Sequence, residues 1–194
     1  MRSFMLAAMV VLLTGCAGSS ERMGEVSAER YSPAPEPGKA MVVFMRPSGV
    51  GFAVQSTVYE LADTGIKIIG IVSAKTKVAH QVEPGKRLFM VMGENADFMS
   101  AELQAGRTYY ASVAPRMGLW KARFAFEPVR RDKLDSDGFK SDFNDTRWVA
   151  KTAATEEWFA ANRDAVQSRR GDYFVDWMKA PEHERAILRA DDGR

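Results

Sequence analysis

Short apolar or alternating segments, separated by turn residues, fill residues 39–129 and limit the folds open to this chain. Alternation indicates a half-buried strand, because successive side chains of a strand point to opposite faces, and a short continuous apolar run indicates a fully buried strand. The candidate strands are residues 40–45, 54–61, 66–72, 75–82, 88–92, 98–103, 108–113 and 119–126. Their close spacing favours a sandwich or barrel over βαβ units. We therefore expect a mainly β fold with C-terminal α structure, in which residues 39–129 form an antiparallel β-sandwich of seven or eight strands.

The pattern changes after Pro128, and residues 130–194 are expected to form a loop and a helical extension. Thr155 followed by two glutamates is typical of a helix start, and Gly171 suits the position just after a helix end. Pro181 can open a further helix. The expected helices cover about residues 155–170, 173–178 and 181–190. We expect two or three helices that cap the sandwich, with the aromatic residues of this region packed against it.

The N-terminal residues are typical of an export signal. Residues 1–15 place Arg2 before an apolar stretch of about ten residues, which is shorter than the roughly 20 residues of a spanning helix. The run Leu13-Thr14-Gly15-Cys16 resembles the lipobox of bacterial lipoproteins, and Cys16 is the single cysteine of the chain. The resemblance implies cleavage before Cys16 and acylation of its thiol and its new amino group. The alternatives are an ordinary signal peptide with an unrelated cysteine, or an apolar N-terminal helix of a cytosolic protein.

A lipidated Cys16 would be followed by a tether. Residues 16–38 lack apolar periodicity and carry Pro33, Pro35 and Pro37, which favours a flexible linker that stiffens toward its end. Each buried CH₂ of an acyl chain contributes about 0.8 kcal/mol, and stable anchoring takes two chains or more. In the lipoprotein family, Asp after the cysteine favours the inner membrane, whereas this chain has Ala17. We therefore expect a lipid anchor in the outer membrane, on its periplasmic face.

Composition excludes several classes of protein. The chain has 27 Lys and Arg against 25 Asp and Glu, so it lacks the charge excess of a nucleic-acid-binding protein. One cysteine excludes an internal disulfide and a cysteine-rich zinc site. We expect no nucleic-acid partner.

Motifs for catalysis or cofactor binding are missing from the sequence. The two histidines, His80 and His183, are too few for a three-ligand zinc site of histidines, and the H-E-x-x-H spacing is absent. The loop Asp135-Ser136-Asp137-Gly138 resembles part of a calcium loop, although polar loops of this kind are usually turns. Nucleophile-elbow, P-loop and dinucleotide-binding patterns are also absent. We expect no cofactor, no metal and no enzymatic activity.

Aromatic and basic residues are mixed near the end of the strand-rich region. Tyr109, Tyr110, Trp120 and Arg123 would suit a face that binds a glycan or an anionic ligand. The same spacing also fits two core strands with aromatic side chains inside and charges outside. The first interpretation makes these four residues the candidate ligand surface.

Three sequence stretches carry a further resemblance, over about residues 38–115. They are Gly38-Lys39-Ala40-Met41-Val42-Val43-Phe44-Met45-Arg46-Pro47, Val82-Glu83-Pro84-Gly85-Lys86, and Leu103-x-Ala105-Gly106-x-Thr108-Tyr109-Tyr110. They are similar to a family of small bacterial envelope lipoproteins, the domain-of-unknown-function group 2846. The Pro-Gly turn before a strand is also similar to PEGA-type and transthyretin-like modules. The resemblance implies a β-sandwich lipoprotein and implies no reaction.

These observations predict a lipid-anchored envelope protein that acts as a binding or scaffolding module, with the membrane and an envelope protein as partners. The first alternative is a periplasmic protein that binds a glycan or another small ligand between the sandwich and the helices. Its pocket would be lined by the helices and by the strand Trp120–Phe126. The second alternative is a hydrolase, which would need converging carboxylates or a perturbed His80.

Overall fold

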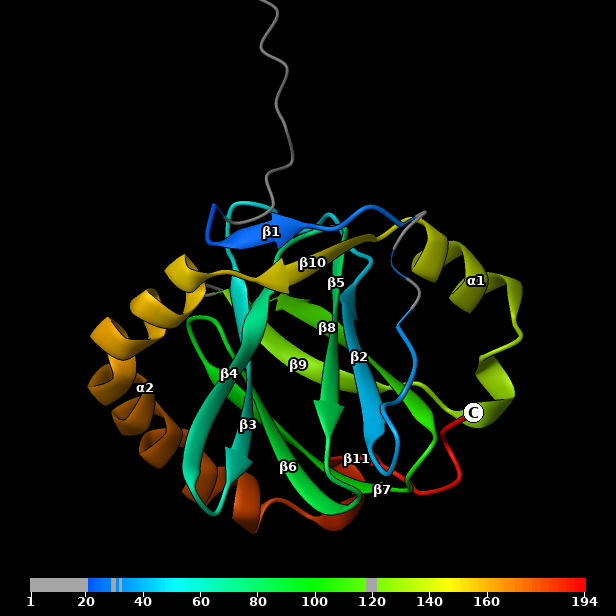
Figure 1. The fold of residues 1–194 in the computed structure, drawn as a ribbon. Coiled ribbons are helices and arrows are strands. Elements are labelled where there is room, and N and C mark those ends of the chain that lie inside the picture. The colour runs from blue at the N-terminus through cyan, green and yellow to red at the C-terminus, as the bar shows by residue number, and fades with distance from the viewer. Residues whose placement is uncertain (1–20, 29–30, 32, 118–121) are drawn as a thin grey trace, which may run out of the picture.

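A computed structural model describes residues 21–28, 31, 33–117 and 122–194. The described residues form two mixed sheets with helices on their outer faces (Figure 1). The six-stranded sheet has, in spatial order, β1 (Met23–Glu25), β10 (Arg147–Lys151), β5 (Thr76–Val82), β2 (Ala40–Arg46), β8 (Thr108–Met117) and β9 (Ala122–Pro128). The five-stranded sheet has β11 (Ala186–Leu188), β7 (Ala96–Leu103), β6 (Gly85–Met92), β3 (Ser56–Ala62) and β4 (Gly65–Val72). The helices are η1 (Arg131–Lys133), α1 (Asp137–Asn144), α2 (Ala153–Lys179) and η2 (Glu182–Glu184).

Each of the eight expected strand segments overlaps a strand of the structure, from β2 to β9. The expectation of a purely antiparallel arrangement is wrong, because β2 pairs with β8, β5 with β10 and β7 with β11 in parallel. The structure also contains three strands that were not expected, β1, β10 and β11. These strands have three to five residues each, so they are too short to show a period.

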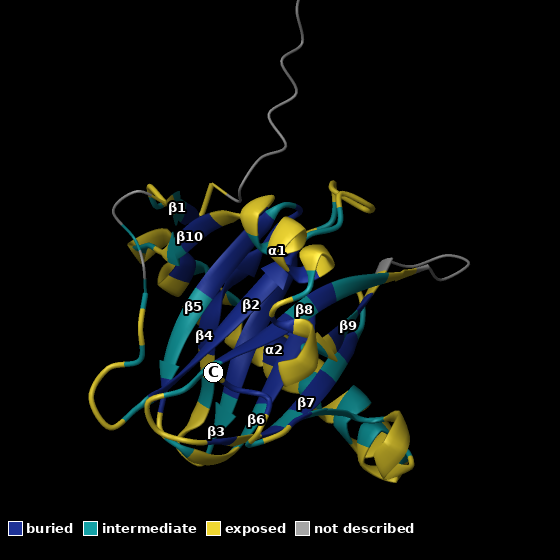
Figure 2. Ribbon diagram, turned by 90° about the vertical axis from the view of Figure 1, so that its right-hand side faces the viewer, coloured by how far each residue is buried: buried dark blue, intermediate teal, exposed yellow. Residues whose placement is uncertain are grey.

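The inner faces of the two sheets share one hydrophobic cluster. Phe44 of β2 contacts Phe89 of the opposite sheet, with ring centroids 5.2 Å apart, and lies 5.7 Å from Phe126 of β9. All seven residues of β2 are buried, because its outer face is also covered. Burial of both faces accounts for its continuous apolar sequence. A strand with one solvent-exposed face would alternate apolar and polar residues. Figure 2 shows the strands largely buried and the helices largely exposed.

Each sheet carries a second cluster on its outer face. On the five-stranded sheet, Phe98 packs against Phe174 and Trp177 of α2, with centroids 5.1 and 5.7 Å away. On the six-stranded sheet, Tyr110 packs against Phe139 of α1 at 5.0 Å. The aromatic residues of the C-terminal region thus pack on the sheets, with α2 on one side and α1 on the other (Figure 1).

The C-terminal region differs from the expected pair or trio of short helices. A single α2 runs for 27 residues and passes through Gly171, which was expected to end a helix. Gly171 has an ordinary negative φ here, and glycine inside a helix costs only about 1 kcal/mol. The contacts of Phe174 and Trp177 beyond it offset that cost. Trp148, in the region expected to be loop and helix, lies in β10, and the helix expected after Pro181 is the short η2 followed by β11.

The segment expected to be a tether contains a strand. β1 pairs antiparallel with β10, and Met23 is buried against β4. A Cβ atom on Gly70 would lie 2.8 Å from Met23 Cε, so glycine makes room for this side chain. The folded domain therefore begins at about residue 22, well before the expected boundary at residue 39.

We predict that Met23→Ala lowers the free energy of unfolding by about 2–5 kcal/mol, as for other buried methionines. Urea denaturation of residues 17–194 measures it. Met178→Ala is the matched control, because Met178 is 53% exposed on α2. Equal stability of the Met23 variant and the parent protein would mean that residues 21–25 act as a tether after all.

Candidate functional site

The structure does not bring the predicted ligand surface together. Tyr109 is buried in the cluster between the sheets, where its hydroxyl accepts from Gln104 N and donates to Ala190 O. Tyr110 points to the opposite face and packs against α1. Arg123 is exposed on β9. This assignment is corrected: successive residues of β8 face different layers, so the two tyrosines cannot share a surface.

Trp120 and the lipobox residues Leu13, Thr14, Gly15 and Cys16 lie outside the described residues.

The histidines do not form a catalytic arrangement with converging carboxylates. His80 Nε2 of β5 lies 3.0 Å from Glu60 Oε2 of β3, so this pair links the two sheets. The hydrogen bond to His80 lowers the pKa of Glu60 and outweighs the effect of burial. His183 is exposed beside Glu184. The structure therefore places His80 in a structural contact.

The acidic loop 135–138 is a helix start. The Ser136 side chain accepts from Phe139 N at 3.2 Å and caps α1, and Asp137 lies in the first turn. In the part of the chain that the structure describes, no group of three or more His, Cys, Asp or Glu residues is arranged to hold a metal.

Lys77 is a buried lysine that sequence patterns did not single out. Its Nζ donates to the carbonyl oxygens of Phe143 and Thr146 and to Thr146 Oγ1. The ammonium also lies 3.9 Å from the ring centroid of Phe143 and 4.9 Å from that of Trp148. Three acceptors use its three protons, so the Lys77 ammonium holds the C-terminal end of α1 on the sheet.

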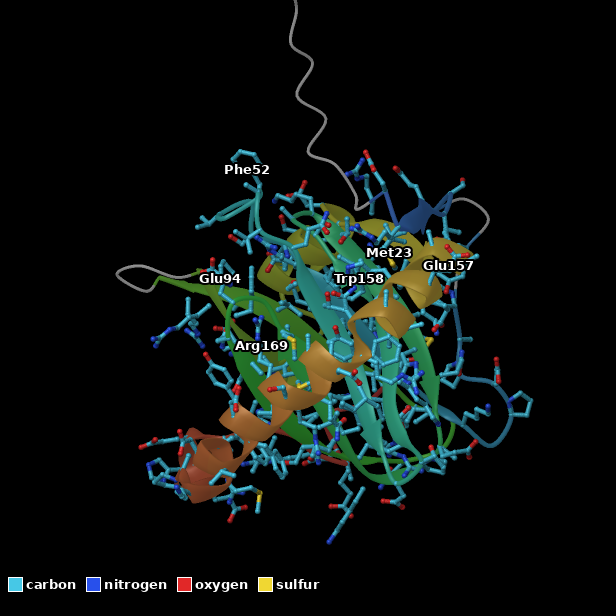
Figure 3. The ribbon with its side chains drawn as sticks, turned by 90° about the vertical axis from the view of Figure 1, so that its left-hand side faces the viewer. Met23, Phe52, Glu94, Glu157, Trp158 and Arg169 are labelled. Atoms are coloured by element: carbon cyan, nitrogen blue, oxygen red, sulfur yellow. The ribbon has the colours of Figure 1, made fainter. Side chains whose placement is uncertain are left out.

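A cavity of about 320 Å³ lies between α2 and the outer face of the five-stranded sheet. Such a volume is at the lower end of the range of small-molecule sites, roughly 300–1,000 Å³. Residues from α2, β3, β4 and β6, and from the segments next to β1, β3 and β6, line it: Arg22, Gln55, Thr57, Tyr59, Ile71, Met92, Gly93, Trp158, Asn162, Ala165, Val166 and Arg169. Figure 3 shows Trp158 and Arg169 along the side of α2 that borders the sheet.

The cavity combines apolar walls with positive charge. Ile71, Met92 and Val166 supply apolar surface, and Arg22 and Arg169 supply two guanidinium groups. Arg169 donates to Gly93 O at 2.8 Å, and it forms no ion pair with any described residue. No Asp or Glu is among the described residues that line the cavity. The site therefore favours a ligand with an apolar body and an anionic group.

Tyr59 adds an unusual polar atom to this site. The side chain is fully buried and packs on Phe159 of α2, with ring centroids 5.7 Å apart. Its hydroxyl makes no hydrogen bond of good geometry with a described residue, although the Thr57 side chain lies close enough to lower its pKa. Burial raises the pKa of this phenol, and the nearby Thr57 and Arg169 offset only part of that rise. An unpaired buried hydroxyl costs free energy of folding, about 1–3 kcal/mol, unless a ligand or water meets it.

The small-ligand alternative called for a pocket between sheet and helix, and the cavity beneath α2 lies at such an interface, but with a different sheet wall. The strand Trp120–Phe126 was expected to line it, whereas the described lining residues come from β3, β4 and β6. The aromatic spacing indicated packed helical faces on both sides of Gly171, which the structure joins in the single helix α2. Which strands lie beneath this helix depends on the order of strands in the sheet, and periodicity does not carry that information.

A second groove of about 630 Å³ lies farther along the same interface, beside the β3–β4 turn. Its Arg87 donates to the carbonyl oxygens of Glu83 and Pro84, so this side chain is held by its own turn. The smaller cavity has the aromatic floor, and we take it as the candidate site.

A comparison with protein-family models gives no match to this chain, and a comparison with curated proteins gives none either. None of the helices that the structure describes combines the length and apolar character needed to cross a bilayer.

We predict a pH-dependent stability that depends on Lys77. Burial lowers the pKa of this ammonium to about 8, from 10.5 in the unfolded chain. Between these pH values the unfolded state binds more protons, so the free energy of unfolding should rise as pH increases from about 8 to 10.5. Urea denaturation across this range measures the rise. It should vanish in Lys77→Met and persist in the exposed control Lys86→Met, and a rise that survives in Lys77→Met would contradict the assignment.

Proposed function

We propose that this chain is a lipid-anchored lipoprotein of the bacterial cell envelope, held through Cys16 at the periplasmic face of the outer membrane. Its folded part, a two-sheet sandwich of the type seen in group 2846, would act by binding rather than by catalysis. The lipobox residues Leu13-Thr14-Gly15-Cys16 support the anchor. Support for a binding role comes from Lys77 and from the Glu60–His80 pair, whose reactive groups are engaged in internal contacts.

The observation that carries the binding proposal is the cavity beneath α2. It brings apolar walls, two arginines and the buried Tyr59 side chain to one place. We infer a small amphipathic anion as ligand, with its charge at Arg169 and its apolar body against Ile71 and Val166. The Tyr59 hydroxyl, which makes no hydrogen bond of good geometry inside the fold, is a further polar group at the wall of this cavity.

The ligand is tested by titration calorimetry of residues 17–194 with decanoate. Arg169→Gln should weaken binding by about tenfold or more, because hydrogen bonds to charged groups contribute about 1.5–3 kcal/mol. Arg163→Gln is the matched control on the same helix, since Arg163 is exposed and does not line the cavity. Tyr59→Phe should weaken binding without lowering the free energy of unfolding.

Three results bear against this ligand assignment. If calorimetry detects no binding of decanoate but does detect binding of a peptidoglycan fragment, the site stands and the ligand class changes. Equal losses in the Arg163 and Arg169 variants would refute the site. Tight binding of uncharged 1-decanol would refute the role of the arginines.

The anchor is tested in cells labelled with radioactive palmitate. Cys16→Ala should abolish the label and leave an unprocessed precursor, because cleavage in this class follows acylation of the thiol. Ser20→Ala, outside the lipobox, should be labelled like the parent protein. Normal labelling of the Cys16 variant would reject the lipoprotein assignment.

A further inference from the structure

A buried arginine organises the loop between β2 and β3. Arg46, the last residue of β2, is fully buried. Its guanidinium donates to the carbonyl oxygens of Val50, Gly51 and Val54 at 2.9, 2.8 and 2.7 Å. It also lies 4.6 Å from the ring centroid of Phe124. Among the described residues no carboxylate pairs with it, so this cation is held by backbone oxygens and sets the shape of loop 47–55.

The tip of this ordered loop exposes two large apolar side chains. Phe52 is 71% exposed and Val50 is 55% exposed. Figure 3 shows Phe52 projecting from the upper end of the molecule. Gly51 between them has φ +66°, a conformation that other residues rarely adopt, and its carbonyl is bound by Arg46. A buried charge therefore holds this apolar tip in solvent. Single hydrophobic residues on a protein surface are common and need no such support.

The loop and the start of the folded chain lie at the same end of the molecule. Arg46 at the base of the loop pairs with Thr76, and Thr76 is also opposite Arg147 of β10. β10 in turn pairs with β1, which crosses this end (Figure 1). Phe52 and Met23, both labelled in Figure 3, are in its upper part. Residue 21 is thus placed near the end that carries the apolar tip.

The length of chain between the anchor and the fold limits how far this end can lie from the membrane. Five residue steps separate Cys16 from Glu21. Even a fully extended chain covers at most about 3.3–3.6 Å per residue, or roughly 18 Å over this stretch. An acylated Cys16 lies at the bilayer surface, so the upper end of the domain is confined close to the lipid headgroups.

We propose that loop 47–55 inserts Phe52 and Val50 into the interfacial region of the bilayer to which Cys16 is anchored. This inference rests on the proposed lipid anchor. Confinement near the surface makes insertion an intramolecular event, which raises the effective concentration of lipid at the loop. Phe suits the interfacial depth that an amphipathic anchor occupies. Loop 47–55 itself carries no charged residue, and the nearby Lys75 and Arg147 form ion pairs with Asp145 and Glu25, so the proposed contact of the tip is apolar.

The test uses the acylated mature protein, residues 16–194, reconstituted in vesicles of phosphatidylethanolamine and phosphatidylglycerol. Cys16 is the single cysteine and its thiol is acylated, so Phe52→Cys introduces one site for a nitroxide spin label. Val175→Cys is the matched control, because Val175 is 55% exposed on α2. We expect the label at 52 to be relaxed by oxygen and protected from a water-soluble nickel complex, and the label at 175 to show the reverse.

The outcomes separate this inference from the anchor itself. Loss of acylation, with no retention on vesicles, would refute the anchor and the insertion together. Retention with a label at 52 as accessible to nickel as the label at 175 would overturn insertion alone. Val50→Cys repeats the measurement with Phe52 in place, in case the first variant perturbs the loop. Protection from both reagents at either loop position would indicate contact with protein and would also overturn the proposal.

Discussion

Burial of β2 on both faces is the constraint on which the rest of this structure depends. Its inner side chains, such as Phe44, meet the second sheet, and its outer ones, such as Met41 and Met45, meet the cluster covered by α1. A strand that is buried on both faces needs a neighbouring strand on each edge, because its buried backbone N–H and C=O groups must form hydrogen bonds. It also needs packed side chains above and below it, because both faces are apolar. β5 and β8 supply the edges. The central place of β2 between β5 and β8, and the cover that α1 gives its outer face, meet these demands.

Two buried cations serve the architecture in different ways. Lys77 satisfies carbonyl oxygens at the end of α1 and keeps that helix on its sheet. Arg46 satisfies carbonyl oxygens of loop 47–55 and keeps that loop in one shape. Neither has a carboxylate partner among the described residues, so each is stabilised by peptide dipoles and aromatic faces. The cations on the rim of the α2 cavity differ, since Arg169 is exposed and able to meet a ligand. The cavity and the proposed membrane loop adjoin each other, because Gln55 at the end of loop 47–55 also lines the cavity.

The strands β2 to β9 could be predicted because each contains enough alternating or apolar residues to show its period. Residues 41–45 and 108–112 gave no sign that they pair in parallel, since pairing between distant segments leaves no local pattern. Met23 lay in a polar segment, and its burial depends on the space left by Gly70 in a strand almost fifty residues away. The candidate ligand residues Tyr109 and Tyr110 were chosen for their chemistry. Their separation follows from strand alternation, which places successive residues of β8 on opposite faces of the sheet, as the core-strand alternative required.

Local patterns were sufficient for the mainly β character of the chain, the helical packing face near residues 158–177 and the lipobox that underlies the proposed anchor, because each is written in adjacent residues. The site beneath α2 could not be read in this way. Tyr59, Ile71, Met92 and Arg169 are far apart in the chain, and they line one cavity only because β3, β4 and β6 lie side by side beneath the helix. The shortness of the tether likewise emerged from β1 pairing with β10, a contact between segments more than 120 residues apart. Packing between layers decides such features, since it brings together groups whose separation in sequence carries no signal.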